Sequence, residues 1–276
     1  MYSIDFENSI GKINLCGGMK PLLSPLLITG LGLPEKEDST AVFAGQAGQK
    51  LLQSRDKARE IVIAGHIHTD YAYAVQACKL LYHAGVLTFR AGNTVKSIDA
   101  RCVGFSDKKI EKNGMFYLQI RFICDNPYFR HPNTIVKQIY NREDKLKSDF
   151  TLPCVVSERV KWGVCVNDGD IPTEPDIVVQ NKGFKTCPGF EIYNQSTGKK
   201  LVYKGDIPVG GTVTLSVANR TVTDDLGADK LMCLNADCYL SEFVLAVGKN
   251  ELVFDGLSDE VWCDCKYNVC FVESIV

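Results

Sequence analysis

The second half of the chain consists of short, closely spaced strand patterns, and this regularity limits the folds open to it. From Trp162 onward, runs such as FEIYN, GTVTLSVAN and ELVFDG follow one another with no helical pattern between them. Clusters of Gly, Pro, Asn and Ser separate the runs, for example at 194–198 and 208–211. Many short strands joined by such turns are typical of an antiparallel β-sandwich. We therefore expect a C-terminal sandwich domain at 161–276.

The first half is predicted to be a β-rich domain that carries one packed helix. Its strongest strand pattern is REIVIAGHI at 59–67. The segment DYAYAVQACKLLYHAG at 70–85 places apolar residues at i, i+3 and i+4, which predicts a helix that stops at its final glycine. The sequence thus predicts a mainly β protein with an N-terminal domain at 1–130 and a connecting segment at 131–160.

A seam between the two domains is predicted at the phrase ICDNPYF. The long strand pattern MFYLQIRFIC stops there, because Pro127 has no N–H group to donate to a strand ladder. Asp125 and Asn126 are typical turn residues. Tyr128 and Phe129 are expected to fold back and fix the direction in which the chain leaves the first domain. These five residues form the predicted domain seam.

The composition is typical of a globular protein. Of the 276 residues, 45% are hydrophobic and 23% are charged. The longest apolar stretch, 21–33, is interrupted by Pro25 and Gly30 and is shorter than the roughly 20 residues that span a bilayer. The first ten residues have no apolar core, so we expect no signal peptide and no membrane insertion.

The charges divide unevenly between the two predicted domains. Residues 1–130 carry 16 basic and 12 acidic residues, a net charge of +4, and the remainder carries 15 and 21, a net charge of −6. Opposite signs indicate two units with different surroundings. Neither half is basic enough to predict nucleic-acid binding.

The twelve cysteines are expected to be free, buried thiols, because no secretion signal is expected and most lie in apolar strand patterns. A zinc ion or iron–sulfur cluster bound by thiolates is the alternative. The spacing differs from paired C-x2-C motifs, and Cys263 and Cys265 alternate as residues on one strand face do, which favours core packing. The candidate ligands are Cys233, Cys238, Cys263, Cys265 and Cys270.

A second possible metal site is the motif His66-x-His68-x-Asp70 at a predicted strand end. Binuclear metal hydrolases use two imidazoles on one strand face in this way. Their pattern usually continues with another histidine, and here the next residue is Tyr71. A strand that runs into a helix cap is therefore the favoured interpretation.

Catalytic motifs of other kinds are missing from the sequence. It contains no G-x-S-x-G elbow, no P-loop and no G-x-G-x-x-G fingerprint after a strand. We predict no catalytic residues, no cofactor and no enzymatic activity.

The order of the motifs resembles that of the siphovirus distal tail proteins. A loop with GQAGQ, the run AREIVIAGHI with its Arg-Glu start, one helix, LTFRAGNTVKSIDARCVG and a strand that ends in ICDNPYF come first. A sandwich pattern with YNQSTGKKLVYKGDIPVGGTVTLSV and LAVGKNELVF follows. The resemblance covers nearly the whole chain. It implies an N-terminal ring-forming domain and a galectin-like C-terminal sandwich.

The resemblance also implies a structural role in a virion. Six copies would form a ring at the distal end of a long non-contractile tail, below the tail tube protein, and DNA would pass through the channel. The ring would bind tail-associated tip proteins and receptor-binding or baseplate proteins, after assembly in the bacterial host cytoplasm.

Members of the family use an arm to embrace the neighbouring subunit, and the polar, glycine-bearing segment 45–57 is the expected arm here. The candidate inter-subunit residues are Gly45, Gln46, Gly48, Gln49, Lys50, Leu51 and Leu52.

A galectin-like carbohydrate-binding module that contributes to host-surface adhesion is the alternative function. Sugar sites need an exposed tryptophan near polar groups. Both tryptophans, Trp162 and Trp262, lie in apolar strand patterns, so core packing is expected for each of them.

Overall fold

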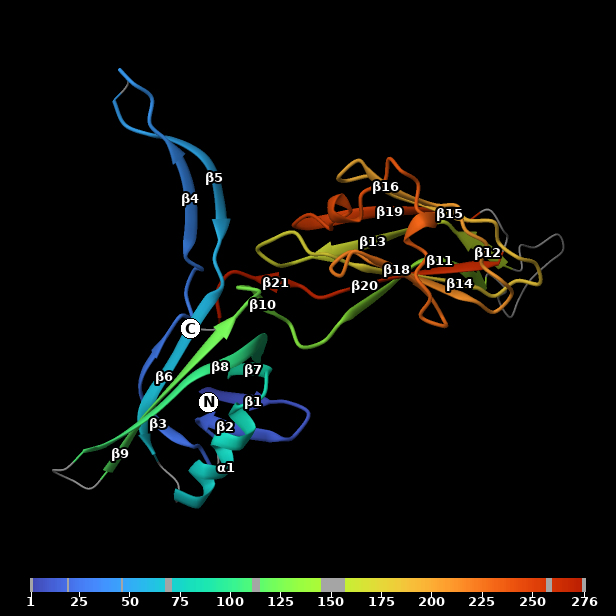
Figure 1. Cartoon of the computed structure of the whole chain (residues 1–276). Coiled ribbons are helices and arrows are strands. Elements are labelled where there is room, and N and C mark those ends of the chain that lie inside the picture. Colours follow the sequence, from blue (N-terminus) through green and yellow to red (C-terminus); the bar gives the residue numbers. More distant parts are fainter. Residues whose placement is uncertain are drawn as a thin grey trace. The chain divides into compact units, whose positions relative to one another are not determined.

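The protein is mainly β, as predicted, and its chain divides into two compact units (Figure 1). The first unit comprises Met1–Pro132 together with Phe271–Val276, and the second comprises Asn133–Cys270. No helix in the described part of the chain is long and apolar enough to cross a membrane. The computed structural model describes residues 2–18, 20–45, 47–67, 71–110, 115–144, 157–256 and 260–274.

Seven strands of the first unit close into a barrel in the order β8-β7-β1-β2-β3-β6-β9, and pairing of β9 with β8 completes the circle. Neighbours are antiparallel except β2 and β3, which meet in parallel at one residue pair, Cys16 and Leu23. The short strands β10 (Phe129–Arg130) and β21 (Cys270–Phe271) extend the same sheet beyond β8. The barrel strands are β1 (Tyr2–Glu7), β2 (Lys12–Cys16), β3 (Leu23–Thr29), β6 (Arg59–Ile67), β7 (Gly85–Ala91), β8 (Thr94–Ile110) and β9 (Met115–Cys124).

Alternating apolar residues fill the barrel. Successive side chains of a strand point to opposite faces, so Ile61 and Ile63 of β6 point inward, and Ile120 and Phe122 of β9 do the same. The Phe122 ring lies 5.5 Å from that of Phe6 on β1. One contiguous core therefore joins strands from both ends of this unit's sequence.

The helix α1 (Tyr71–Leu81) is shorter than predicted. Ala77 and Leu81 are buried in the barrel core, whereas Tyr82 lies past the helix end and is 83% exposed. Gly85 begins β7 and does not cap the helix. A Cβ atom at this position would lie 2.4 Å from the carbonyl oxygen of Glu7, so close approach of two strands explains the glycine.

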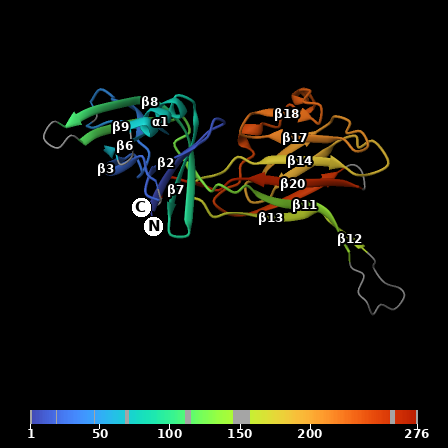
Figure 2. The ribbon, with the colours of Figure 1, turned by 90° about the horizontal axis from the view of Figure 1, so that it is seen from below.

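The second unit contains two antiparallel sheets (Figure 2). One has the strand order β12-β11-β20-β14-β17-β18 and the other has the order β13-β19-β15-β16. Two single 3-10 turns, η1 (Leu231–Cys233) and η2 (Leu240–Glu242), precede β19. The strands are β11 (Ile135–Asp144), β12 (Ser157–Val160), β13 (Trp162–Asn167), β14 (Asp176–Asn181), β15 (Phe190–Asn194), β16 (Lys199–Tyr203), β17 (Thr212–Ser216), β18 (Thr221–Asp224), β19 (Gly248–Gly256) and β20 (Val261–Tyr267).

The inner faces of these two sheets pack against each other. In β20 every second residue from Val261 to Tyr267 is buried, which leaves the other face of the strand partly exposed. The Tyr267 hydroxyl on one sheet donates to the Val166 carbonyl on the other at 3.0 Å and accepts from the Val166 N–H at 3.1 Å. The galectin-like form of this arrangement stays a prediction.

Two segments belong to other units than the sequence predicted. The stretch 131–160, expected to be a connection, contributes β11 and β12 to the second unit, and β11 pairs with β20 from Ile135 opposite Tyr267. The stretch 271–276, expected in the C-terminal sandwich, belongs to the first unit. Local patterns identify strands but not their partners, because pairing is a long-range property.

Candidate assembly site

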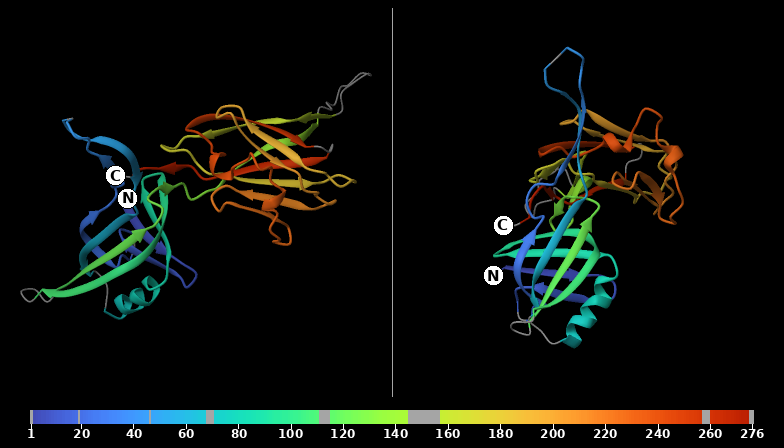
Figure 3. Two further views of the ribbon diagram at one scale, coloured as in Figure 1. Left: turned by 45° about the horizontal axis from the view of Figure 1, so that its top comes forward. Right: turned by 60° about the vertical axis from the view of Figure 1, so that its left-hand side comes forward.

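A two-stranded ribbon projects from the barrel of the first unit (Figure 3). It consists of β4 (Lys36–Ala41) and β5 (Lys50–Asp56), which pair with each other and with no other strand of the described chain. Residues 36–40 and 50–55 are all exposed. An isolated two-stranded ribbon is at best marginally stable in water, so this arm depends on its attachment to the barrel.

The predicted inter-subunit residues lie at and after the tip of the arm. Gly45 and Gly48 are in the connection between β4 and β5, with φ angles of +80° and +85° that favour glycine. Gln46 lies outside the described residues. The other candidates are Gln49, which precedes β5, and Lys50, Leu51 and Leu52, which belong to β5.

Four large apolar side chains are exposed near the tip, and we call them the arm patch: Val42, Phe43, Leu51 and Leu52. Val42 is 76% exposed. Leu51 and Leu52 are consecutive strand residues, so they point to opposite faces of the ribbon. Exposed apolar side chains on an open strand pair are candidates for a protein contact. The sequence interpretation missed Val42 and Phe43, although the apolar run AVFA directly before Gly45 was a usable signal.

Polar side chains hold the register of the ribbon. The Arg55 guanidinium donates to Glu37 at 2.7 Å, and the Ser54 hydroxyl donates to Asp38 at 2.5 Å. Below them, the Lys57 N–H donates to the Glu35 carbonyl at 2.8 Å. Exposed ion pairs contribute little to stability, so they order the arm without anchoring it.

Arg59 anchors the root of the arm. It is the first residue of β6 and is only 4% exposed. Its guanidinium donates to four backbone carbonyls: those of Pro127 and Gly30, each at 2.7 Å, Gly32 at 2.5 Å and Val272 at 2.6 Å. Burial lowers the pKa of Arg59, yet an arginine stays protonated in proteins. The carbonyl dipoles therefore compensate a buried positive charge.

These bonds connect three parts of the first unit. Gly30 and Gly32 lie between β3 and the arm, Pro127 lies in the predicted seam, and Val272 lies in the segment that returns after the second unit. The Ser274 N–H adds a bond to the Leu31 carbonyl at 2.9 Å. The arm root, the seam and the returning segment are thus fixed to one another.

The residues of the predicted seam also form contacts at the arm root. The Tyr128 hydroxyl donates to Asp56 at 2.6 Å, at the end of β5, and the Asn126 side chain accepts from the Tyr128 N–H at 3.1 Å. Phe129 is fully buried, and the Arg59 guanidinium lies 4.7 Å from its ring centre. Asp125 is exposed and forms a 3.4 Å ion pair with Arg101.

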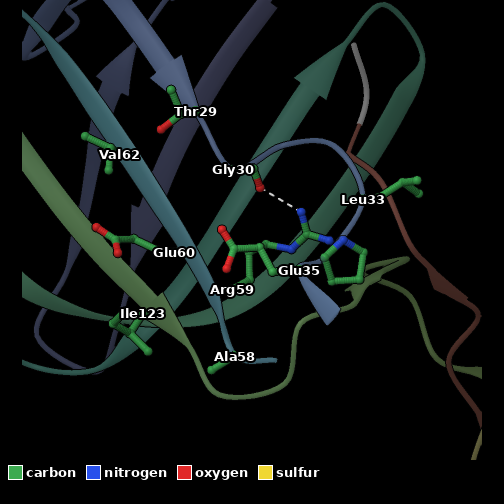
Figure 4. A pocket seen from close by; sticks show the side chains of 10 residues that line it. Thr29, Gly30, Leu33, Glu35, Ala58, Arg59, Glu60, Val62 and Ile123 are labelled. Atoms are coloured by element: carbon green, nitrogen blue, oxygen red, sulfur yellow. Dashed lines mark hydrogen bonds between the residues drawn. The ribbon is translucent and has the colours of Figure 1, made fainter. Parts of the chain in front are cut away.

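A cavity of about 480 Å³ opens beside the Arg59 guanidinium at the arm root (Figure 4). Leu33, Val62 and Ile123 give it apolar walls, and Glu35 and Glu60 line it with carboxylates. Its lining residues come from β3, β6, β9 and the connection to the arm, so the cavity lies on the outside of the barrel.

The histidine motif does not form a site in the described part of the chain. His66 is half-buried on β6, and its ring meets the edge of the Tyr117 ring at 6.2 Å. His68 and Asp70 lie outside the described residues. Among the residues that the structure describes, no three His, Cys, Asp or Glu side chains gather closely enough to hold a metal ion.

Within the described ranges, none of the candidate cysteine ligands takes part in a disulfide, and they are distributed over several elements of the second unit and β21. Cys263 and Cys265 point into the core of the second unit, where burial raises the pKa of Cys263 well above its usual value. A hydrogen bond with Cys165 and burial do the same for the pKa of Cys265. A raised pKa favours the protonated thiol over the thiolate. The others lie in η1 (Cys233), in the loop after it (Cys238) and in β21 (Cys270).

Comparison with known proteins places the fold. No family model and no curated protein sequence matches the chain. Among solved structures it is similar to the SPP1 Dit (gp 19.1) protein, described as a paradigm of the hub adsorption apparatus in phages that infect Gram-positive bacteria. The TM-score is 0.70, with 13% identity over 98% of this chain and 99% of that chain.

Two structures of the phage P2 baseplate in its activated conformation are also similar. For the structure with Ca the TM-score is 0.54, at 10% identity over 98% of both chains. For the structure with Sr the TM-score is 0.51, at 11% identity over 96% of this chain and 98% of that chain. The chain therefore has the fold of phage hub and baseplate proteins. Its predicted resemblance to the siphovirus distal tail proteins is confirmed at the level of the fold.

Proposed function

We propose that this chain is a structural, non-enzymatic hub subunit at the distal end of a phage tail. One observation carries the proposal: the likeness to the SPP1 hub protein extends over 98% of this chain and includes both units. A shared barrel alone would be weak support, because one fold serves many functions. A shared combination of barrel, arm and second unit is more specific.

In this proposal six copies close into a ring through their first units. A closed ring needs two different complementary patches on each copy. The arm patch supplies one, and the surface of the neighbouring barrel supplies the other. The ring stacks on the tail tube protein, DNA passes through it, and the second units, galectin-like in architecture, bind tip, receptor-binding or baseplate proteins. Such a protein assembles in the bacterial cytoplasm and ends in the virion.

The test is the mass and shape of the purified full chain. Light scattering over a series of concentrations is expected to give the mass of six chains, and negative-stain images are expected to show rings with an open centre. A chain that stays monomeric at its highest soluble concentration, both alone and with a tail tube protein, contradicts the ring.

Carbohydrate binding is a second candidate function, and one observation favours it. Trp162, which the sequence predicted to lie in the core, is 61% exposed on β13. Trp262 is half-buried, and the Lys182 ammonium lies 3.7 Å from its ring centre. The core prediction for Trp162 was wrong because its strand has one solvated face, and an apolar pattern does not identify which face that is.

A further inference from the structure

The outer face of the β13-β19-β15-β16 sheet carries a row of side chains that is unusual for a solvated surface. Trp162, Val253 and Tyr193 are cross-strand neighbours in this order, and Lys200 follows on the edge strand. Adjacent strands are about 4.8 Å apart, so the positions of Trp162 and Tyr193 are about 10 Å apart. We call Trp162, Val253 and Tyr193 the aromatic row.

The alternation of β13 forces Trp162 outward. Gly163 and Cys165 are buried in the core, so Trp162, Val164 and Val166 face the other way. An added Cβ atom at Gly163 would come within 2.9 Å of the Gln138 carbonyl oxygen, so no larger residue fits there. Burial of a large apolar side chain stabilises a fold by about 1.5–3 kcal/mol. Because Trp162 is mostly exposed, it contributes only a part of this free energy.

Charged residues lie beside the row and at its Lys200 end, and each carboxylate has a lysine partner. The face is therefore close to neutral although it is rich in hydrogen-bonding groups. It offers carboxylate acceptors and ammonium donors beside an apolar strip. Val164 and Val166 continue the apolar surface along β13. The ion pairs are Lys161–Asp255 at 3.1 Å, Lys200–Glu191 at 3.9 Å and Lys249–Glu251 at 2.6 Å.

We propose that this face binds a neutral carbohydrate, with sugar rings stacked on Trp162 and Tyr193. The C–H groups on one face of a sugar ring are apolar and slightly positive, so the electron-rich face of an aromatic ring attracts them. The hydroxyl groups at the ring edge donate to carboxylates such as Glu191 and Asp255. The row is long enough for a short oligosaccharide.

The chemistry of the rim favours a sugar over a protein partner. The centre of a protein interface is depleted in Lys, Glu and Asp, whereas here Asp255, Glu191 and Lys200 lie directly beside the aromatic row on the neighbouring strand positions. An open face of this kind binds one ligand weakly, and several copies in one assembly would raise the avidity. The inference rests on the second candidate function given above and names its binding face and ligand class. It is independent of the proposed hub function, because the proposed ring involves the first unit.

The experiment screens the full chain on an array of neutral and acidic oligosaccharides from bacteria, plants and animals. The neutral oligosaccharide with the strongest signal is then titrated while tryptophan fluorescence is recorded. The variant Trp262→Phe leaves Trp162 as the single tryptophan reporter, since the chain has two.

Trp162→Ala is expected to weaken binding at least tenfold and Tyr193→Ala severalfold. Phe184→Ala is the matched control, because Phe184 is 90% exposed in the same unit but outside the row.

Unchanged circular dichroism and melting temperature show that the variants fold, and light scattering on Trp162→Ala reports ring formation separately. Sugar binding that is lost in Trp162→Ala and kept in Phe184→Ala supports the inference. It is overturned if the wild-type chain binds no oligosaccharide, or if Trp162→Ala binds as tightly as the wild type. Binding of a tail protein that needs Trp162, without sugar binding, also overturns it.

Discussion

Arg59 shows how one side chain can define a site that no local pattern describes. Its bond to Val272 joins residues 213 positions apart. The sequence marks an Arg-Glu pair at the start of a strand, and the strand itself, β6, was predictable from its apolar run. The four carbonyl acceptors were not, because backbone groups are present at every position and carry no residue-specific signal.

Replacement of Arg59 should destabilise the first unit strongly. Arg59→Met leaves four buried or part-buried carbonyls without this donor, and each buried acceptor left unsatisfied costs about 1–3 kcal/mol. Arg59→Lys keeps the charge but cannot reach all four acceptors, because an ammonium lacks the planar fork of a guanidinium. Its loss of unfolding free energy in urea should therefore be intermediate.

The matched control for this comparison is Arg55→Met, which removes an exposed arginine of the arm. Surface substitutions of this kind change stability by only about 0.5 kcal/mol or less. Equal stability of the Arg59→Met and Arg55→Met proteins would show that the buried network is not what secures the arm root.

The arm is the element that the sequence described least completely. The polar, glycine-bearing stretch 45–57 predicted an exposed segment, but the first strand of the ribbon is β4, whose residues Lys36, Glu37 and Asp38 have low strand propensity. Pairing with β5 overrides that propensity. The end of α1 shows the same limit. Gly85 is required by the close approach of the Glu7 backbone, and the periodicity of a sequence does not reveal such a contact.

Loss of the arm patch should weaken assembly and leave the fold intact. In the double variant Leu51→Ser and Leu52→Ser, both side chains are exposed, so the melting temperature should stay near the wild-type value. The concentration needed for ring formation should rise at least tenfold in light scattering. The control is Tyr82→Ser, which removes an exposed aromatic next to α1. If the double variant assembles as readily as this control, the arm patch is not an assembly contact.

At the scale of the whole molecule, the first unit is built from two separate stretches of sequence. The two-part, mainly β organisation was predictable from strand patterns, turn signals and the charge difference. The return of the chain to the first unit was not. Only Asn268 and Val269 separate β20 from β21, and the two strands join different sheets. The strand-like pattern continues through both strands, so it offered no reason to assign β20 and β21 to different sheets.

Deletion of residues 271–276 should therefore destabilise the first unit and spare the second. It removes the Val272 carbonyl from the Arg59 network, the Ser274 bond to Leu31 and the contact of the Phe271 ring with the Lys96 ammonium at 4.2 Å. In calorimetry, one of two melting transitions should move to lower temperature. A chain that ends at residue 274 keeps these contacts and is the control. A shift of both transitions, or of neither, would contradict the assignment of the segment to the first unit.

The returning segment also has a consequence for the order of folding during synthesis. Domains generally fold as units from the N-terminus as the chain leaves the ribosome. Here the whole second unit is translated before Val272, and until Val272 emerges Arg59 lacks one of its four acceptors. The domain that is translated first thus becomes complete last, and the arm root is finished only when translation of the second unit has ended.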